Sequence, residues 1–194
     1  MNFFKAFFAV NPSQVKKKVV ISPIVYPSQF EKIISQKGKH YKSTLSYLVA
    51  DFKDVTFIKT PMTQSAIYDL VVLLAKTRCK EIVFLGAIGG LQKVLKIGDI
   101  VVSKKAGDVY SVKSIHEETK KKLSSLRKKG VIGIDFESQS FFKAAKQAKL
   151  SAIAYYVVTD LPLSKPFYLK KTKKQIERVK SSINQIIQMI VTII

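Results

Sequence analysis

Short runs of β-branched and other apolar residues alternate along this chain with longer segments that have helical periodicity. The runs lie at 19–21, 55–58, 81–85 and 152–159, and the last of them is almost continuously apolar. A strand that is covered on both faces has this pattern, whereas a half-exposed strand alternates apolar and polar residues. The alternation therefore predicts an α/β fold of three layers, α/β/α, with a twisted and mostly parallel or mixed central sheet.

The predicted elements follow from the positions of these runs and of their Gly, Pro and acidic boundaries. The strands are expected near 18–22, 55–59, 81–85, 99–103, 131–136 and 152–159. The helices are expected from residue 28, at 64–76 after a Thr63 N-cap, at 113–129, at 138–149, and from residue 171 onward. The glycine-rich segment 86–90 is interpreted as a loop.

A stripe of aliphatic residues runs along the last helix, from Ile176 to Ile190. It predicts a helix that docks on the body of the protein or lies at a subunit contact, and attachment to a membrane surface is the alternative. The chain has 194 residues with no internal repeat and no linker, which fits one domain spanning 1–194. We expect a homo-oligomer.

The chain contains one cysteine, Cys79, and no Cys/His cluster with the spacing of metal ligands. We therefore expect no intramolecular disulfide, no metal and no cofactor, and we give Cys79 no role. No segment approaches the roughly 20 apolar residues that span a bilayer. The apolar N-terminal run is short, is interrupted by Lys5 and has no evident cleavage site. We expect a cytoplasmic protein without a membrane partner.

The formal net charge of +21 would attract any polyanion, including nucleic acid, anionic lipid and phosphorylated small molecules. The lysines are scattered from Lys5 to Lys180, without the aromatic interleaving of a single-strand groove and without a nucleic-acid-binding motif. We therefore expect no specific nucleic-acid partner. Solvated lysine faces are the simpler interpretation of this charge.

Three polar features follow predicted strands: the segment 86–90, the turn at 135–138, and the pair Thr159 and Asp160. Ligands bind at strand ends in α/β sheets, and a carboxylate there is costly unless something pairs with it. Glu137 and Asp160 are therefore candidate site residues. The structural alternatives are a helix N-terminal carboxylate for Glu137 and a turn or N-cap residue before Pro162 for Asp160.

Three sequence motifs include these strand ends. The first is Gly86-Ala87-Ile88-Gly89-Gly90-Leu91 with its continuation Leu95-Lys96-Ile97-Gly98-Asp99-Ile100-Val101-Val102. The second is Ile134-Asp135-Phe136-Glu137-Ser138, followed by the Ala-rich helix that contains Ala144 and Ala145, and the third is Val157-Val158-Thr159-Asp160. In this order the motifs resemble those of the purine and uridine phosphorylase superfamily, which contains nucleoside phosphorylases and nucleosidases. The resemblance extends from about residue 64 to 160.

The resemblance implies cleavage of an N-glycosidic bond in a purine nucleoside-type substrate, with water or phosphate as the nucleophile. It implies that Glu137 accepts hydrogen bonds from the ribose hydroxyls and that Phe136 lies against the sugar. It also implies that Asp160 is the catalytic residue, which donates a proton or hydrogen bond to the leaving base. The backbone of Gly86, Ala87, Gly89 and Gly90 would complete the substrate site. A raised carboxyl pKa at an apolar strand end would suit an acid of this kind.

The chain also departs from the family pattern at the phosphate site. Phe84 and Ala87 replace the arginine and the hydroxyl residue that bind phosphate, and Ser22-Pro23-Ile24 stands where a phosphate loop is expected. These departures favour hydrolysis over phosphorolysis, although a phosphate or other anion stays open as a partner. The segment 23–27 also lacks the glutamate that activates water in nucleosidases, and Glu31 comes later.

Three functions are consistent with the sequence. The leading hypothesis is an enzyme of nucleoside metabolism, a hydrolase or glycosyltransferase that binds ribose through Glu137 and the base through Asp160. The second is a non-catalytic nucleoside- or nucleotide-binding protein on the same fold. The third is a basic, nucleic-acid-associated protein that has the same fold. The presence of Glu137 and Asp160 disfavours this third function.

Overall fold

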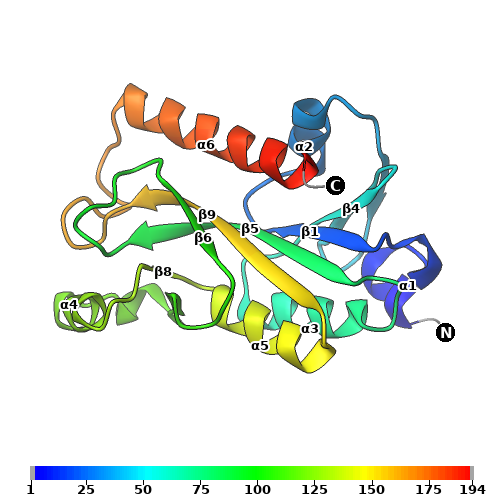
Figure 1. Ribbon diagram of the computed structural model, residues 1–194, viewed down its shortest axis with the longest axis horizontal. Helices are drawn as coiled ribbons and strands as arrows, with labels where there is room; N and C mark the ends of the chain where they lie inside the picture. Colours follow the sequence, from blue (N-terminus) through cyan, green and yellow to red (C-terminus); the bar gives the residue numbers. More distant parts are fainter. Residues whose placement is uncertain (1–2, 193–194) are drawn as a thin grey trace.

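The computed structural model describes residues 3–192 and shows a central sheet between two layers of helices (Figure 1). The longer helices are α2 (Pro27–Ile34), α3 (Gln64–Leu74), α4 (Lys120–Lys128), α5 (Ser138–Ala148) and α6 (Lys173–Thr192). A short helix α1 (Phe3–Phe8) precedes them, and two 3₁₀ turns, η1 and η2, lie at Pro12–Gln14 and Ile115–Glu117.

Nine strands within residues 3–192 form one mixed sheet. They are β1 (Lys18–Ser22), β2 (Lys39–Lys42), β3 (Leu48–Asp51), β4 (Val55–Lys59), β5 (Glu81–Gly90), β6 (Ile100–Ser103), β7 (Val109–Ser111), β8 (Gly133–Asp135) and β9 (Ser151–Asp160). The order is β2-β3-β4-β1-β5-β8-β7, and β9 pairs with β5 and β6. The three runs predicted at 81–85, 131–136 and 152–159 therefore contribute to one sheet, as expected.

The centre of the sheet is parallel. Strand β5 runs parallel to β1 on one side and to β9 on the other, and β9 pairs with β5 along nearly its whole length. The carboxyl ends of β5 and β9 consequently meet at one edge of the sheet, next to β8, which pairs antiparallel with Gly89 and Gly90. The topology brings the three sequence motifs to the same place.

Each face of the sheet has its own apolar core. Helices α3 and α5 cover one face, where Phe84, Phe141 and Tyr156 pack together. Helices α2 and α6 cover the other, where Phe30 stacks on Phe57. The Thr63 side chain accepts a hydrogen bond from the Ala66 amide and caps α3, as predicted. These two cores account for the apolar character of both faces of β1, β5 and β9.

The aliphatic stripe of α6 is buried within the chain. Ile186, Ile187 and Ile190 are buried in the core against the sheet and α2, whereas Ile176, at the start of the helix, is 43% exposed. The docked-helix interpretation is therefore correct, and the buried part of the stripe is not available for a subunit contact. No helix in the described range, 3–192, is long and apolar enough to cross a membrane.

The structure corrects three expectations about local elements. The segment 86–90 is the continuation of strand β5 rather than a loop, because it pairs with β9 and then with β8. The segment 113–129 is helical only from Lys120, where Thr119 caps α4, and η2 precedes it. The strands β2, β3 and β7 were not predicted, since they are short and partly polar and depend on edge pairing for their formation.

Candidate active site

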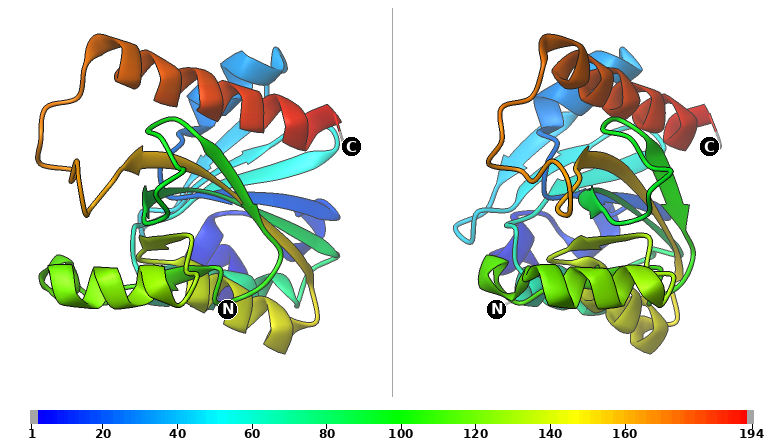
Figure 2. Two further views of the ribbon diagram at one scale, coloured as in Figure 1. Left: turned by 60° about the vertical axis from the view of Figure 1, so that its left-hand side comes forward. Right: turned by 90° about the vertical axis from the view of Figure 1, so that its left-hand side faces the viewer.

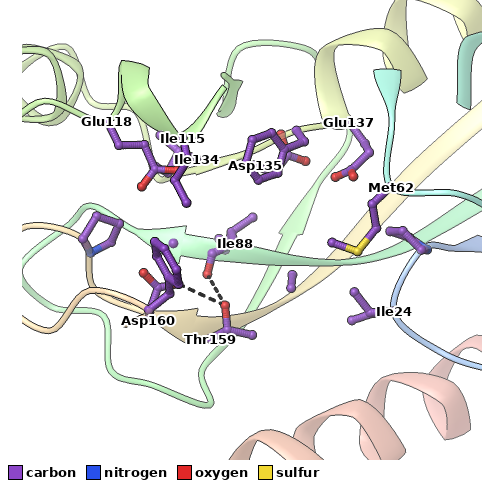
Figure 3. A pocket seen from close by; sticks show the side chains of 16 residues that line it. Ile24, Met62, Ile88, Ile115, Glu118, Ile134, Asp135, Glu137, Thr159 and Asp160 are labelled. Atoms are coloured by element: carbon purple, nitrogen blue, oxygen red, sulfur yellow. Dashed lines mark hydrogen bonds between the residues drawn. The ribbon is translucent and has the colours of Figure 1, made fainter. Parts of the chain in front are cut away.

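A pocket of about 260 Å³ opens at the carboxyl ends of β5 and β9 (Figure 3). Its wall is largely apolar and includes segments from six different parts of the chain. Sixteen residues line it: Pro23, Ile24, Met62, Ala87, Ile88, Gly89, Ile115, Glu118, Ile134, Asp135, Phe136, Glu137, Thr159, Asp160, Pro162 and Phe167. The structure thus brings Phe136, Glu137 and Asp160 to one pocket with Ala87 and Gly89.

The turn between β8 and α5 separates the roles of two neighbouring acids. Asp135 ends β8, and its Oδ2 accepts a hydrogen bond of 2.9 Å from the Ser138 amide at the start of α5. Glu137 occupies the N-cap position of α5 but makes no side-chain cap hydrogen bond. Because Asp135 satisfies the helix amide in its place, the Glu137 side chain is free to face the pocket. Glu137 is thus a carboxylate at the helix N-terminus, as the structural alternative expects, but its side chain does not cap the helix.

Glu137 is buried without a full set of partners. Its side chain is 5% exposed, and its Oε1 has no hydrogen-bond partner in the described part of the chain. Burial and, secondarily, the negative charge of Asp135 raise the pKa of Glu137 to about 8, although a backbone hydrogen bond at Phe136 opposes the shift. An unpaired buried carboxyl oxygen is costly, so this group is poised to accept a hydrogen bond from a ligand.

Asp135 differs from Glu137 in having several partners. The Ser111 hydroxyl donates to its Oδ1 at 2.7 Å, and the Ser138 hydroxyl donates to its Oδ2. The Tyr156 hydroxyl in turn lies 2.6 Å from the Ser138 oxygen and donates to it. Burial raises the pKa of Asp135, and these hydrogen bonds oppose the shift. Asp135 is thus the centre of a buried hydrogen-bond network in the pocket wall.

Asp160 is the last residue of β9 and is 7% exposed. The Thr159 hydroxyl donates to its Oδ1 at 3.1 Å. Burial raises the pKa of Asp160, while the Thr159 hydrogen bond and the positive charge of Lys171 oppose this effect. Since Asp160 ends a strand and no helix begins there, it is not an N-cap residue.

A fourth pocket carboxyl, Glu118, was not predicted from the sequence. It follows η2 in a lysine-rich segment, and its half-buried side chain lines the pocket at the same end as Asp160 (Figure 3). Burial and the charge of Asp160 raise the pKa of Glu118. No local pattern could have revealed it, because its position in the pocket comes from the packing of 115–119 against the end of the sheet.

Two of the predicted site glycines, Gly86 and Gly90, do not line this pocket. A Cβ on Gly86 would lie 2.4 Å from the Phe84 ring, and one on Gly90 would lie 3.0 Å from Val158 Cγ1. These glycines therefore make room for neighbouring core side chains instead of for a ligand. Gly89 lines the pocket, but a Cβ there would lie 2.7 Å from Pro162, so its packing against the protein is also close.

The pocket wall within the described range contains no Lys, Arg or His side chain. Phe84, at the position expected for a phosphate-binding arginine, packs on Phe141 and Tyr156 in the core. The Ser22 hydroxyl donates to the Leu85 carbonyl at 2.7 Å and accepts from the Ile24 and Val25 amides, so it closes the turn after β1. Glu31, on α2, pairs with His40 on β2 and is absent from the pocket wall.

The site could hold a small uncharged ligand that presents hydrogen-bond donors to carboxyl groups. No group of three or more His, Cys, Asp or Glu side chains in residues 3–192 has the arrangement of a metal site. In Figure 3, Glu137 lies beside Met62 at one end of the pocket, while Asp160 and Glu118 lie at the other. A ligand that fills the pocket would therefore meet carboxyls at two separate ends.

Comparison with known proteins identifies the fold. No family model and no curated protein sequence matches the chain. Among solved structures, an AMP nucleosidase from Bacteroides thetaiotaomicron superposes with a TM-score of 0.73 and 16% identity over 98% of this chain and 96% of its own. A uridine phosphorylase from Vibrio fischeri superposes with a TM-score of 0.70 and 13% identity over 95% and 93% of the two chains. The chain therefore has the fold of the purine and uridine phosphorylase superfamily.

Proposed function

We propose that this protein hydrolyses the N-glycosidic bond of a purine nucleoside-type substrate. The observation that carries the proposal is the unpartnered Oε1 of Glu137, which is buried in a pocket at the carboxyl ends of β5 and β9. A sugar hydroxyl is an uncharged donor that satisfies such an oxygen without bringing a counter-charge. The AMP nucleosidase and uridine phosphorylase folds support the same class of ligand.

The ribose lies at the Glu137 end of the pocket and the base at the Asp160 end. Glu137 accepts hydrogen bonds from the ribose hydroxyls, and Phe136 contributes an apolar surface for the sugar. The separation of Glu137 from Asp160 in Figure 3 supports this arrangement, because a nucleoside has its hydroxyls and its base at opposite sides of the glycosidic bond. Hydroxyl donors favour the ionised form of Glu137, so binding lowers its raised pKa.

Asp160 acts as the general acid. The bond between C1′ and the base nitrogen breaks as positive charge develops on the ribose. Asp160 then gives its proton to the base, the water oxygen bonds to C1′, and the water loses a proton that restores Asp160. A carboxyl with a raised pKa is protonated closer to neutral pH, which suits this role.

Water is favoured over phosphate as the nucleophile by the charge of the pocket. The wall contains carboxyls and no cationic side chain within the described residues. Glu137, which is ionised when it accepts from the ribose hydroxyls, stabilises a sugar with developing positive charge, whereas no cation in the wall is present to neutralise a phosphate dianion. Ile24, Met62 and Ala87, which also line the pocket, have apolar side chains that offer a phosphate no hydrogen-bond donor.

The second candidate is a nucleoside-binding protein without catalysis. It is favoured by the absence of an acid from the turn that follows β1, since Pro23 and Ile24 line the pocket there. Hydrolysis requires a base to position and activate the water, whereas binding does not. Glu137 and Asp160 would then serve recognition alone.

Base release from a panel of purine and pyrimidine nucleosides, with and without phosphate, tests the proposal. The expected result is release of free base from purine nucleosides at a rate that phosphate does not change. Asp160→Asn provides the control for contaminating activity. Release that requires phosphate would establish phosphorolysis instead, and tight binding without release would establish the binding protein.

We also propose that the protein is a homo-oligomer. Phe167, Tyr168 and Leu169 are exposed apolar residues in the segment between β9 and α6, which projects at the end of the sheet near α4 (Figure 2). Contiguous exposed apolar residues favour association. Light scattering at tens of micromolar should give at least a dimer mass, and a monomer would refute this proposal.

A further inference from the structure

Two lysine-rich segments, 113–129 and 165–174, flank the pocket. Together they contain twelve of the 34 Lys and Arg residues of the chain but two of its 13 Asp and Glu residues. Ile115 and Glu118 from the first segment and Phe167 from the second line the pocket. In Figure 2, α4 and the segment before α6 project beyond the sheet on the same side. Positive charge is thus concentrated around a pocket whose own wall, within residues 3–192, has no cationic side chain.

A second cavity, of about 460 Å³, lies along α4 beside this pocket and is called the α4 groove below. Its lining residues are Tyr110, Thr119, Lys121, Lys122, Ser125, Leu126 and Lys129. Tyr110 in β7 is the register partner of Ile134 in β8, and Ile134 lines the pocket. Neighbouring strands lie about 4.8 Å apart. Glu118 in the pocket wall also precedes Thr119 in the α4 groove, so the two cavities are adjacent.

The fold does not account for the lysines of the α4 groove. Lys121 and Lys129 are exposed, and neither pairs with an acid in the part of the chain that the structure describes. Lys122 differs, because it pairs with Glu117 and its Nζ lies 4.9 Å from the centroid of the Tyr110 ring. Three consecutive lysines form the first turn of α4, where the helix macrodipole disfavours cations. Helix stability therefore does not explain this concentration of charge.

The shape of this surface suits a single nucleic-acid strand better than a lipid surface. Leu123 and Leu126 are buried against Ile134, so α4 presents lysines without the apolar side chains that insert into a membrane interface. The α4 groove is concave, and Tyr110 adds an aromatic ring to its lining. Cationic grooves with aromatic rings bind the backbone and the bases of single strands. The lysines come from a helix and the ring from a distant strand, so only the tertiary structure combines them.

We propose that the α4 groove binds the phosphate backbone of a single-stranded RNA and that the adjacent pocket receives one nucleoside unit of the same strand. This inference rests on the proposed function for the role of the pocket, and it adds to that function the class of substrate. The contacts are made to phosphates, so binding is independent of base sequence. It therefore agrees with the expected absence of a specific nucleic-acid partner.

The distribution of charge separates the parts of such a ligand. Phosphates lie against Lys121 and Lys129, while the uncharged base and ribose enter the pocket, where the ionisable side chains are carboxyls. The unpartnered Oε1 of Glu137 accepts from the 2′-hydroxyl, which every unit of an RNA strand retains. A base within a duplex is stacked and paired, so an unpaired unit enters the pocket at a lower cost.

The reaction on a strand has the same balance as that on a free nucleoside. The bond between C1′ and the base nitrogen breaks, the water oxygen bonds to C1′, and the base leaves with a proton. The product is a strand with an abasic ribose, whose C1′ reacts as an aldehyde. This product gives a readout that is separate from the released base.

Fluorescence anisotropy with a labelled, single-stranded RNA of mixed sequence and about 12 nucleotides tests binding to the full chain. The logarithm of the wild-type affinity should fall against the logarithm of salt concentration, by about 0.7 for each phosphate contact. The double variant Lys121→Gln/Lys129→Gln should reduce this slope by about 1.4. Lys32→Gln/Lys37→Gln changes two exposed lysines that line neither cavity, and it should keep the wild-type slope.

The same measurement distinguishes the other occupants of this surface. An equal loss of RNA affinity in both double variants would overturn the inference, because the charge would then act diffusely. Binding of a duplex of the same sequence as tightly as the single strand would also overturn it. So would binding of vesicles of phosphatidylserine and phosphatidylcholine, but not of RNA, if Lys121→Gln/Lys129→Gln abolished it.

A kinetic comparison separates this inference from the proposed function. Base release is measured for the RNA and for free adenosine and guanosine, and the abasic strand is detected with an aldehyde-reactive label. At low salt the wild-type kcat/KM should be roughly 10-fold or more higher for the RNA, and Lys121→Gln/Lys129→Gln should bring the ratio close to one. Lys32→Gln/Lys37→Gln should keep the wild-type ratio.

The two proposals fail in different ways. If RNA binds through the α4 groove but no base is released from RNA or nucleoside, the proposed function is refuted and the RNA site stands. If free nucleosides are cleaved while the two double variants bind RNA alike, this inference is refuted and the proposed function stands.

Discussion

Asp135 and Glu137 lie two residues apart and are buried to the same extent, but they differ in their hydrogen bonds. Asp135 belongs to a buried hydrogen-bond network, whereas Glu137 belongs to the pocket wall. Asp135 accepts hydrogen bonds from Ser111 and from both the amide and the hydroxyl of Ser138. Glu137 keeps an oxygen with no partner within residues 3–192. Burial alone therefore does not distinguish a structural acid from one that meets a ligand. The distinction lies in how many donors the protein itself supplies.

The largest expected effect is a pH-dependent loss of stability caused by Glu137. Its ordinary pKa of 4.5 rises to about 8 in the folded protein. Between these values the folded state holds a proton that the unfolded chain has released, so the free energy of unfolding falls as pH rises through this window. The contribution is on the order of 4 kcal/mol. Glu137→Gln should remove this part of the pH dependence.

Urea unfolding of both proteins at pH 5, 7 and 9 measures the effect. Glu137→Gln should be more stable than the wild type at pH 9 and similar to it at pH 5. Glu117→Gln, which changes a partly exposed and ion-paired glutamate outside the pocket, is the control and should follow the wild-type trend. If the free energy of unfolding changed with pH in the same way in the wild type and in Glu137→Gln, the pKa of Glu137 would not be raised. Its carboxylate would then have a hydrogen-bond or ion-pair partner.

The next effect concerns Asp160 and belongs to the proposed reaction. Asp160→Asn should lower kcat by about 10²- to 10⁴-fold, because the leaving base loses its proton donor. KM should change little, since the amide still makes hydrogen bonds to the base in the ground state. Single-turnover and steady-state base release measure the two quantities. A large rise in KM with unchanged kcat would assign Asp160 to binding instead of proton transfer.

Asp135→Asn should act on stability first. One of the two accepting oxygens would become an amide nitrogen, which cannot accept from either Ser111 or Ser138, and the loss of a buried hydrogen bond costs about 2 kcal/mol. The charge of Asp135 is also one cause of the raised Glu137 pKa, so this pKa should fall in the variant. Denaturant unfolding gives the first effect, and the pH dependence of stability gives the second. An unchanged Glu137 pKa in the variant would show that the Asp135 network and Glu137 are not electrostatically coupled.

The smallest expected effect is that of Tyr156→Phe. The substitution removes the hydroxyl that donates to Ser138 and keeps the ring that packs on Phe84. One neutral hydrogen bond contributes about 1 kcal/mol, and base release should be preserved. Thermal or urea unfolding measures the loss. A strong loss of activity would show that the network extends functionally into the pocket.

Much of the layered fold was predictable, because it follows from patterns within single segments. The apolar run of β9 and the Thr63 cap of α3 both appear where the sequence indicates them. The hairpin of β2 and β3 was not predictable, since its strands are short and β2 is largely exposed. Its strands gain their hydrogen bonds from neighbours in the sheet, and those neighbours are not visible in local composition.

The candidate site was likewise predictable only in part. Glu137 and Asp160 were predicted as site residues because each follows an apolar run, where a carboxylate is costly to bury. The glycines at 86 and 90 do not line the pocket, and a glycine that makes room for Phe84 or Val158 has the same sequence signal as one that approaches a ligand. Space around a residue is a property of tertiary packing.

The sequence by itself determined the alternation of strands and helices, and with it the strand ends at which carboxyl groups would gather. Only the tertiary structure decided which carboxyls find partners. Asp135 is satisfied by Ser111 from another strand, and Glu118 lines the same end of the pocket as Asp160 although the two lie far apart in the sequence. Hydrogen bonding and electrostatic coupling depend on distances of a few ångströms, and for residues this far apart in the chain those distances are set by packing alone.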